Sequence, residues 1–480
     1  MRCFYTPAAS ASVEKLFESA RKMPFRRNHT VLKDHLRMSF FRTDVPWPSL
    51  CTVLAAVFLG VFAFSTFRAE LALAREDTLQ EIEERKAWDE KRKKLREERR
   101  KKKGVQKKKD SPPAEKIRIA FLTQEVEVPP ALSNLDPVLT DEGVHGARIA
   151  IEDNNTTGTF LNQDYILAEV TVPLGGDLVA AFKKLVAGGH RHVVINLPAA
   201  DVLALADLAE ASEVLIYNTS APDDALRNEQ CRANVLHTIP SRAMLADALA
   251  QFLVKKKWKE WFLVTGPGEG DRLFAEAIKR AADKFGADIE EEKVWDFTAD
   301  IRRTASAEVP VFTQDVDYDV LIVADEPGEF GEYLIWRTWD PSLVAGTQGL
   351  VPTAWHRTHE RWGAAQMQNR FRREAGRWMT SVDYAAWIAV RSVGEAVTRA
   401  KSTDFAKVKE FMLGPEFSLA AYKGIKVTYR AWNGQLRERI LLAAPRSLVS
   451  VSPQKEFLHP VSEVDTLGYD KPESKCGNPD

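Results

Sequence analysis

The sequence lacks most of the signals that mark an enzyme or a metalloprotein. It contains no G-x-S-x-G elbow, no Walker loop and no G-x-G-x-x-G after its first predicted strand. The glycine-rich stretch 265–271 lacks the Lys-Ser/Thr of a phosphate loop, and the neighbours Asp325 and Glu326 point to opposite faces of a predicted strand. Only four cysteines and nine histidines are present, and no Cys/His spacing indicates a metal site. We therefore expect no enzyme, no required cofactor and no metal.

A long hydrophobic run is also lacking. The apolar stretch 50–64 has about fifteen residues, short of the roughly twenty that span a bilayer as a helix. Small residues follow at Ala72 and Ala74, the two positions that a signal peptidase requires. The pattern predicts a secretory signal cleaved after Ala74, and a start at Met38 would give it an ordinary n-region. A signal anchor left in place is the alternative.

The scarcity of cysteine agrees with export. Cys3 and Cys51 would leave with the signal, so the mature chain keeps Cys231 and Cys476. Two cysteines in an oxidising compartment suggest one disulfide that ties the far C-terminal part back to the body. Two unpaired thiols are the alternative.

Apolar residues are almost absent from the charged arm, residues 75–115. Such a segment cannot bury a core, although Glu and Lys/Arg at i,i+4 spacing favour a solvated helix up to Lys103. Pro112 and Pro113 end it. An exported chain meets little nucleic acid, so we expect a spacer or a contact with a membrane surface.

From Lys116 onward, short apolar runs alternate with stretches of helical spacing, which predicts α/β lobes with parallel sheets. Two such sets follow each other, so we expect two lobes around a cleft, with ligands outside the carboxyl ends of the strands. Expected strands are 116–124, 165–172, 192–197, 214–220, 260–266, 293–298, 318–327 and 349–355, with a hairpin at 424–444 turning at Asn433-Gly434. Expected helices are 142–155, 176–189, 199–212, 241–258, 270–289, 328–339, 364–376 and 381–400.

This order of elements resembles the type I periplasmic binding proteins, in particular the leucine/isoleucine/valine-binding group of ABC-transporter solute receptors. The stretches that carry the resemblance are GVHGARIAIEDNNTTG, VLIYNTSAPDDALR, VLHTIPSRAMLADALAQFL and YKGIKVTYRAWNGQL. It implies two Rossmann-like lobes joined by hinge crossings. We expect a signal region at 1–74, the arm at 75–115, lobe 1 at 116–239 with 348–424, lobe 2 at 240–347 with 425–452, and a tail at 453–480.

A narrower resemblance is carried by LTQEVEVPPALSNLDP, VAGTQGLVPTAWHRTHERWGAAQMQNRF and VSEVDTLGYDKPESKC. These stretches are similar to solute-binding proteins associated with catabolism dependent on pyrroloquinoline quinone (PQQ). The resemblance implies a periplasmic, monomeric binder of PQQ or a related anionic, aromatic solute, with an ABC permease or a quinoprotein dehydrogenase as partner. An amino acid is disfavoured, because the turn at Pro198, Ala199 and Ala200 offers no hydroxyl to a carboxylate.

Candidate ligand-binding residues follow from this chemistry, since tryptophan stacks on flat rings and arginine pairs with carboxylates. Trp336 and Trp339 would share a helix face beside Arg337, while Trp387 sits among Ala and Ile and is assigned to the core. Further candidates lie at predicted strand ends or a helix start: Gln124, Asn218, Thr219, Ser220, Arg242, Trp355 and His356.

Three other functions remain open from the sequence. The chain can be a permease-independent sensor or a protein that delivers cofactor to a quinoprotein dehydrogenase. It can be an enzyme on the same fold. If the signal is not cleaved, it can be an anchored structural protein. Neighbouring permease genes, turnover by the purified protein and the mature N-terminus would separate these alternatives.

Overall fold

The computed structural model describes residues 94, 114–127, 138–295 and 301–477. The predicted signal and nearly all of the charged arm lie outside these residues. Within the described ranges, no helix combines the length and the apolar content needed to cross a membrane.

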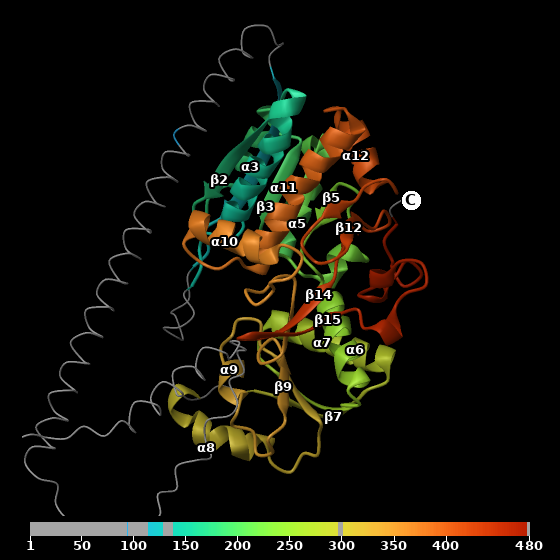
Figure 1. Cartoon of the computed structure of the whole chain (residues 1–480). Coiled ribbons are helices and arrows are strands. Elements are labelled where there is room, and N and C mark those ends of the chain that lie inside the picture. The colour runs from blue at the N-terminus through green and yellow to red at the C-terminus, as the bar shows by residue number, and fades with distance from the viewer. Residues whose placement is uncertain (1–93, 95–113, 128–137, 296–300, 478–480) are drawn as a thin grey trace, which may run out of the picture. The chain divides into compact units, whose positions relative to one another are not determined.

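The first lobe is built on a five-stranded sheet of order β2-β1-β3-β4-β5 in which every neighbouring pair is parallel (Figure 1). Apolar residues alternate between its two faces: Ile119 and Phe121 join one hydrophobic core, and Leu122 joins another. Burial on both faces is typical of a parallel sheet. The strands are β1 (Glu115–Gln124), β2 (Gln163–Val172), β3 (His192–Asn196), β4 (Leu215–Asn218) and β5 (Val235–His237).

Helices cover both faces of this sheet. One core takes side chains from α3 (Val144–Leu161), α10 (Ala364–Ala375), α11 (Ser381–Ala400) and α12 (Phe405–Leu413). The opposite core takes them from α4 (Leu178–Ala187) and α5 (Ala199–Ala206). Short 3-10 turns follow at η1 (Ala209–Glu213) and η2 (Asp224–Arg227), so the helix expected over 199–212 ends early.

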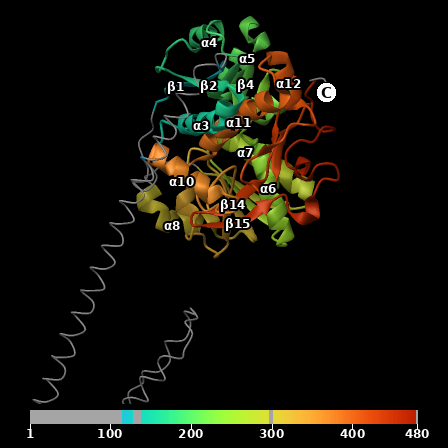
Figure 2. The ribbon, with the colours of Figure 1, turned by 45° about the horizontal axis from the view of Figure 1, so that its top comes forward.

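The helices α3 and α11 lie side by side (Figures 1 and 2). A Cβ atom on Gly146 would stand 1.9 Å from the carbonyl oxygen of Asp383, so only glycine permits this approach. Asn154 Nδ2 donates to the Val390 carbonyl at 2.9 Å. These contacts join the returning segment of the chain to the first lobe.

The second lobe has a four-stranded sheet of order β7-β6-β8-β9, again parallel throughout. Its strands are β6 (Glu260–Thr265), β7 (Asp288–Val294), β8 (Val320–Ala324) and β9 (Leu343–Gly346). One face packs against α6 (Arg242–Lys255) and α7 (Glu269–Phe285), and the other against α8 (Ile301–Thr313) and α9 (Gly331–Leu334). The predicted fold class, two α/β lobes with parallel-rich sheets, is confirmed.

Several element boundaries in the second lobe differ from the prediction. The strand expected at 293–298 is instead β7, which ends at Val294. Two elements are not predicted by the sequence pattern: α8, which has Pro310 within it, and β9, which has only four residues. The run 349–355 contributes only β10 (Val351–Thr353). Helical or strand periodicity is hard to recognise in such short or proline-containing segments.

The C-terminal part of the chain serves both lobes. A hairpin of β12 (Lys426–Tyr429) and β13 (Leu436–Arg437) turns at the predicted Asn433-Gly434, with Gly434 at φ 68°, and β11 (Leu419–Ala420) pairs beside it. Although 425–452 was assigned to lobe 2, Val427 and Leu436 of this hairpin belong to the first core. The antiparallel sheet β10-β14-β15 follows, with β14 (Ile440–Ala444) and β15 (Ser447–Ser452). Ile440 and Leu442 enter the second core.

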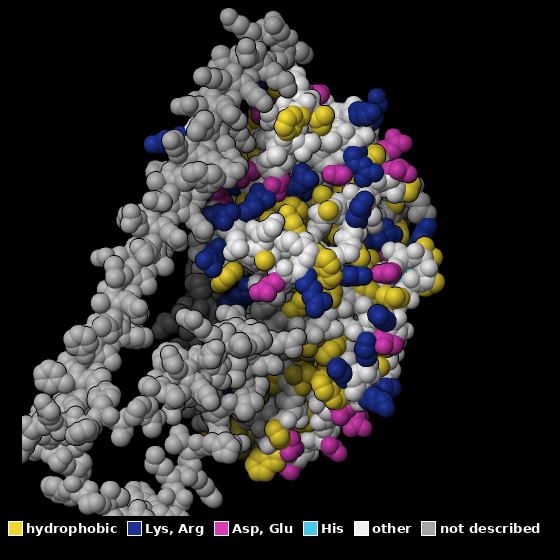
Figure 3. Space-filling view, viewed as in Figure 1, with side chains coloured by type: hydrophobic (Ala, Val, Ile, Leu, Met, Phe, Trp, Pro, Cys, Tyr) yellow, Lys and Arg dark blue, Asp and Glu magenta, His cyan; other side chains and the backbone are white. Residues whose placement is uncertain are grey.

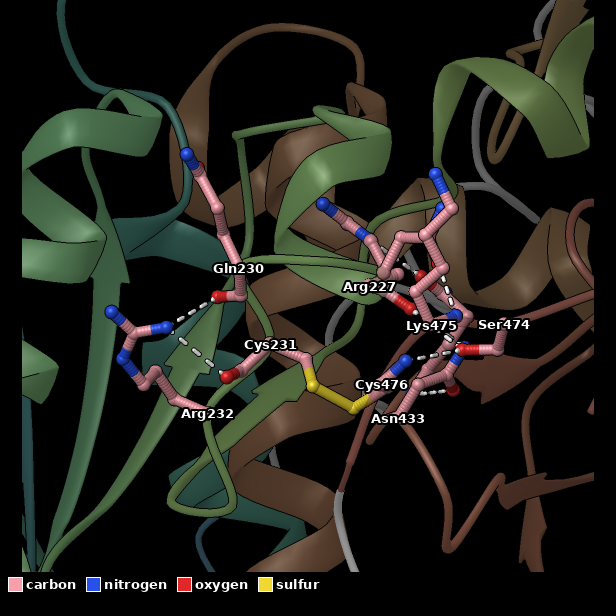
Figure 4. Close-up of a disulfide and its surroundings, with 10 residues drawn as sticks. Arg227, Gln230, Cys231, Arg232, Asn433, Ser474, Lys475 and Cys476 are labelled. Atoms are coloured by element: carbon pink, nitrogen blue, oxygen red, sulfur yellow. Dashed lines mark hydrogen bonds between the residues drawn. A yellow bond between two sulfur atoms is a disulfide. The ribbon is translucent and has the colours of Figure 1, made fainter.

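The tail carries η3 (Lys455–Phe457) and η4 (Glu463–Thr466) and connects the lobes again. Leu467 is buried in the second core. Further on, Cys476 forms the predicted disulfide with Cys231, with 5.6 Å between their Cα atoms, and Ser474 Oγ donates to the Arg227 carbonyl at 3.4 Å (Figure 4). The tail is therefore fixed at one end to lobe 2 and at the other to a loop of lobe 1.

Candidate functional site

The carboxyl ends of the first-lobe strands carry several of the predicted site residues. Gln124 ends β1, and Asn218 ends β4 and is followed by Thr219 and Ser220. Asn218 and Thr219 are fully buried. Their position at this edge of the sheet agrees with the sequence analysis.

These side chains nevertheless donate hydrogen bonds to backbone carbonyls of the protein. Thr219 Oγ1 donates to the Ile195 carbonyl at 2.8 Å, and Ser220 Oγ donates to the Leu197 carbonyl at 3.1 Å. The Asn218 and Gln124 amides donate to the carbonyls of Ala221 and Gly176. These bonds shape the loops at the edge and use the hydrogen-bond donors of the four side chains, so a ligand there would meet chiefly acceptor atoms.

Two helix starts lie at this edge, and at the first of them the Gly143 amide already donates to Asp383 Oδ1 at 2.7 Å. The N-caps of α3 and α5 are Gly143 and Pro198, and neither has a side-chain cap hydrogen bond. Asn196 Nδ2 donates to the Glu142 carbonyl at 3.2 Å and so ties the loop after β3 to the start of α3. Burial raises the pKa of the Glu142 carboxyl. Asp201 lies in the first turn of α5, whereas α3 has no acidic residue there.

Arg242, predicted from its place at a helix start, is the centre of an ion-pair cluster. Its guanidinium binds both oxygens of Glu326, which follows β8, at 2.7 Å each. It also lies 3.0 Å from Asp223, in the loop between β4 and β5. Burial alone would lower the pKa of Arg242, but Glu326 and Asp223 raise it above its ordinary value. Arg242 therefore links a loop of the first sheet to a loop of the second, and its charge is already neutralised.

We expect Arg242→Met to lower the free energy of unfolding by about 2 kcal/mol, because it leaves two half-buried carboxylates without their cation. Arg232→Met is the matched control, since Arg232 pairs with the exposed Asp207 and should cost at most about 1 kcal/mol. Urea unfolding of both variants gives the comparison. Equal losses would mean that the Arg242 cluster is no stronger than a surface ion pair.

The stretch 336–339 does not form the expected cleft wall. The helix α9 ends at Leu334, and Trp336 has φ 67°, so Trp336 and Trp339 do not share a helix face. The Trp339 amide donates to Thr313 Oγ1 at 2.8 Å, at the end of α8. Thr313 leads into the amino-terminal end of β8, opposite the edge where ligands bind. Trp336 and Trp339 are 95% and 61% exposed, so the expected shared helix face beside Arg337 was wrong, while a ligand-binding role of these residues stays a prediction.

Trp355 is also misassigned, because it is buried in the first core. Its ring stacks on Tyr384 with centroids 4.5 Å apart. His356 is half-buried, and its Nδ1 lies 2.7 Å from Thr358 Oγ1. Burial lowers the pKa of His356. Trp387 belongs to the core as predicted, and its Nε1 donates to Asp153 at 3.0 Å.

An open cavity of about 560 Å³ lies next to His356 and was not predicted. It is lined by residues of three segments: the loop after β10, a single residue ahead of α11, and the turn between β14 and β15 with the first two residues of β15. The main lining residues are Arg357, Thr358, Glu360, Trp378, Arg446 and Leu448. The only sequence signal was the aromatic and basic composition of AWHRTHERW, because the β14–β15 turn lies about ninety residues further along the chain.

Within the described residues, no group of three or more His, Cys, Asp and Glu side chains is arranged to hold a metal ion. The geometry offers amide donors, guanidinium groups and an indole ring. This set of groups binds anions and flat rings by non-covalent contacts.

Comparison with known proteins identifies the fold. Residues 141–313 match the family model described as "Periplasmic binding protein". No curated protein sequence matches the chain.

Solved structures match over most of their length. A branched chain amino acid ABC transporter periplasmic ligand-binding protein from Burkholderia xenovorans is 16% identical, with a TM-score of 0.60 over 75% of this chain and 99% of that one. A periplasmic binding protein from Burkholderia mallei is 18% identical, with a TM-score of 0.55 over 76% and 99%. A leucine-, isoleucine-, valine-, threonine- and alanine-binding protein from Brucella ovis, in a closed conformation, is 14% identical, with a TM-score of 0.56 over 73% and 98%. From Glu115 onward the chain has the fold of the type I periplasmic binding proteins.

Proposed function

We propose that the chain is the periplasmic solute-binding component of an ABC-type uptake system, and that its solute is PQQ or a related flat, anionic compound. The observation that carries the proposal is the pair of helix starts at the carboxyl edge of the first sheet. Neither α3 nor α5 has a side-chain cap, and although the Gly143 amide already donates to Asp383 Oδ1 at 2.7 Å, the remaining first-turn amides can meet an anion. The proposal includes an ABC permease as partner.

The fold supports the class of function. Two lobes joined by several chain crossings bind a ligand by hinge closure. The matching structures include substrate-binding proteins of ABC transporters, among them a Desulfitobacterium hafniense protein solved in complex with Leu. The same comparison supports a periplasmic location, which is part of the proposal. An enzyme on this fold is not favoured by any group at the strand ends, and delivery of a cofactor without a permease remains the runner-up.

The turn after β3 and the pairing of Arg242 bear on the kind of solute. The first turn after β3 begins with Pro198, Ala199 and Ala200, so a carboxylate there finds backbone donors and no hydroxyl. The available cation at the second sheet, Arg242, is already paired with Glu326 and Asp223. A solute with several carboxylates would place negative charge near the first-turn amides of α3 and α5.

Titration with PQQ, followed by tryptophan fluorescence and quinone absorption, is the test. We expect saturable binding at micromolar concentration or tighter, and no comparable response to leucine. Trp336→Leu should leave PQQ binding unchanged, because Trp336 lies away from the carboxyl edges of both sheets.

Two other outcomes would redirect the assignment. Leucine binding without PQQ binding would make the chain an amino-acid receptor. Failure of both ligands, with folding intact by circular dichroism, would remove PQQ and leave only the fold.

A further inference from the structure

The cavity beside His356 combines two unpaired cations with an aromatic ring. Arg357 and Arg446 make no ion pair with any described residue, and Arg357 Nη2 donates a hydrogen bond to the Pro445 carbonyl at 2.9 Å. Trp378 is 42% exposed. The single acidic residue of the lining, Glu360, does not balance the two guanidinium groups.

More positive charge surrounds this cavity. The Arg372 guanidinium lies over the Trp378 ring, 5.1 Å from its centroid. Arg372 and Arg373 occupy the last turn of α10, and Figure 3 shows Lys and Arg side chains gathered over that helix. The local field therefore favours an anion.

The volume of the cavity and its lining side chains restrict the kind of ligand further. A volume of about 560 Å³ lies in the range of small-molecule sites. An indole ring takes a flat apolar group, and each guanidinium takes a carboxylate through two parallel hydrogen bonds. Leu448 adds an apolar side to the cavity.

We propose that this cavity is a binding site for a flat dicarboxylate, with one carboxylate on each of Arg357 and Arg446 and the ring on Trp378. The site goes beyond the proposed function, because none of its lining residues lies at a carboxyl end of the two parallel sheets. It also joins both lobes: Met379, next to Trp378, is in the first core, and Leu442 of β14 is in the second. A bound dicarboxylate therefore holds the β14–β15 turn against lobe 1.

The experiment uses the full chain and benzene-1,4-dicarboxylate as probe, with isothermal titration calorimetry as readout. We expect one site per chain, weakened about tenfold or more by Arg446→Gln, which removes a bidentate ion pair. Trp378→Leu should weaken binding about tenfold through loss of stacking. Cyclohexane-1,4-dicarboxylate and benzoate, which lack the flat ring or the second carboxylate, should bind more weakly.

Arg337→Gln is the matched control, because Arg337 is an exposed arginine on the other lobe surface beside Tyr333. It should leave the affinity unchanged. All three substituted residues are exposed, so each variant should keep its thermal unfolding midpoint.

No binding of the probe at millimolar concentration would overturn the proposal, and so would binding that Arg446→Gln and Trp378→Leu leave intact. The dicarboxylate titration and the test of the proposed function can fail independently. PQQ binding that survives Arg446→Gln would place PQQ elsewhere, while failure of PQQ to bind would not affect the dicarboxylate titration.

Discussion

Lys423→Met should lower the free energy of unfolding by about 3–5 kcal/mol, because it removes one partner of a fully buried ion pair. The Lys423 ammonium donates to Glu438 and, at 2.8 Å, to the Arg439 carbonyl, and it lies 4.7 Å from the centroid of the Tyr384 ring. Neither Lys423 nor Glu438 is exposed to solvent. Burial raises the pKa of Glu438 and lowers the pKa of Lys423.

The double variant Lys423→Met/Glu438→Leu is the control. It removes both charges, so it should recover most of the lost stability. A pH series adds a second signature: without Lys423, the raised pKa of Glu438 in the folded state makes stability rise as the pH falls and the carboxyl takes up a proton. A single variant that costs less than about 1 kcal/mol, or a double variant as unstable as the single one, would contradict the account.

Loss of the disulfide is the second large expected effect. The bond closes a loop with a sequence separation of 245 residues. Cys231→Ser/Cys476→Ser should lower the free energy of unfolding by about 2–5 kcal/mol, because the unfolded chain is no longer constrained. Replacing both cysteines leaves no unpaired partner thiol from this disulfide.

Guanidinium unfolding, with and without a thiol reductant, measures this effect. The reduced wild type should match the double variant, and reductant should not change the double variant at all. Stability that is identical in the oxidised wild type and the double variant would show that the tail is held by its non-covalent contacts alone. Those contacts include the hydrogen bond of Gly468 to Asp247 at 2.8 Å.

Much of the fold could be predicted because the buried strands are continuous apolar runs and the helices have clear starts. Ser241 caps α6 by accepting a hydrogen bond from the Met244 amide, as its place after Pro240 predicts. The hairpin turn at Gly434 could be predicted from the local Asn-Gly pair. The pairing of Cys231 with Cys476 could be predicted because the mature chain keeps only two cysteines.

The candidate site was harder to predict from the sequence, because it depends on contacts between segments that are distant along the chain. Spacing alone suggested that Trp336 and Trp339 share a helix face, but a hydrogen bond from Trp339 to Thr313 holds that stretch in a turn. The spacing of residues at the end of β4 gave the right position for Asn218 and Thr219. It carried no information on the backbone carbonyls to which their side chains donate hydrogen bonds. The cavity between Trp378 and Arg446 joins segments about seventy residues apart, so no local pattern reveals it.

The interleaved route of the chain has a consequence for its biogenesis. The first core needs side chains from Ile117 through Leu436, and the second needs them from Met244 through Leu467. Neither core can be completed while the ribosome is still making the middle of the chain. These two cores can therefore be completed only late in translation, after the C-terminal part of the chain has emerged.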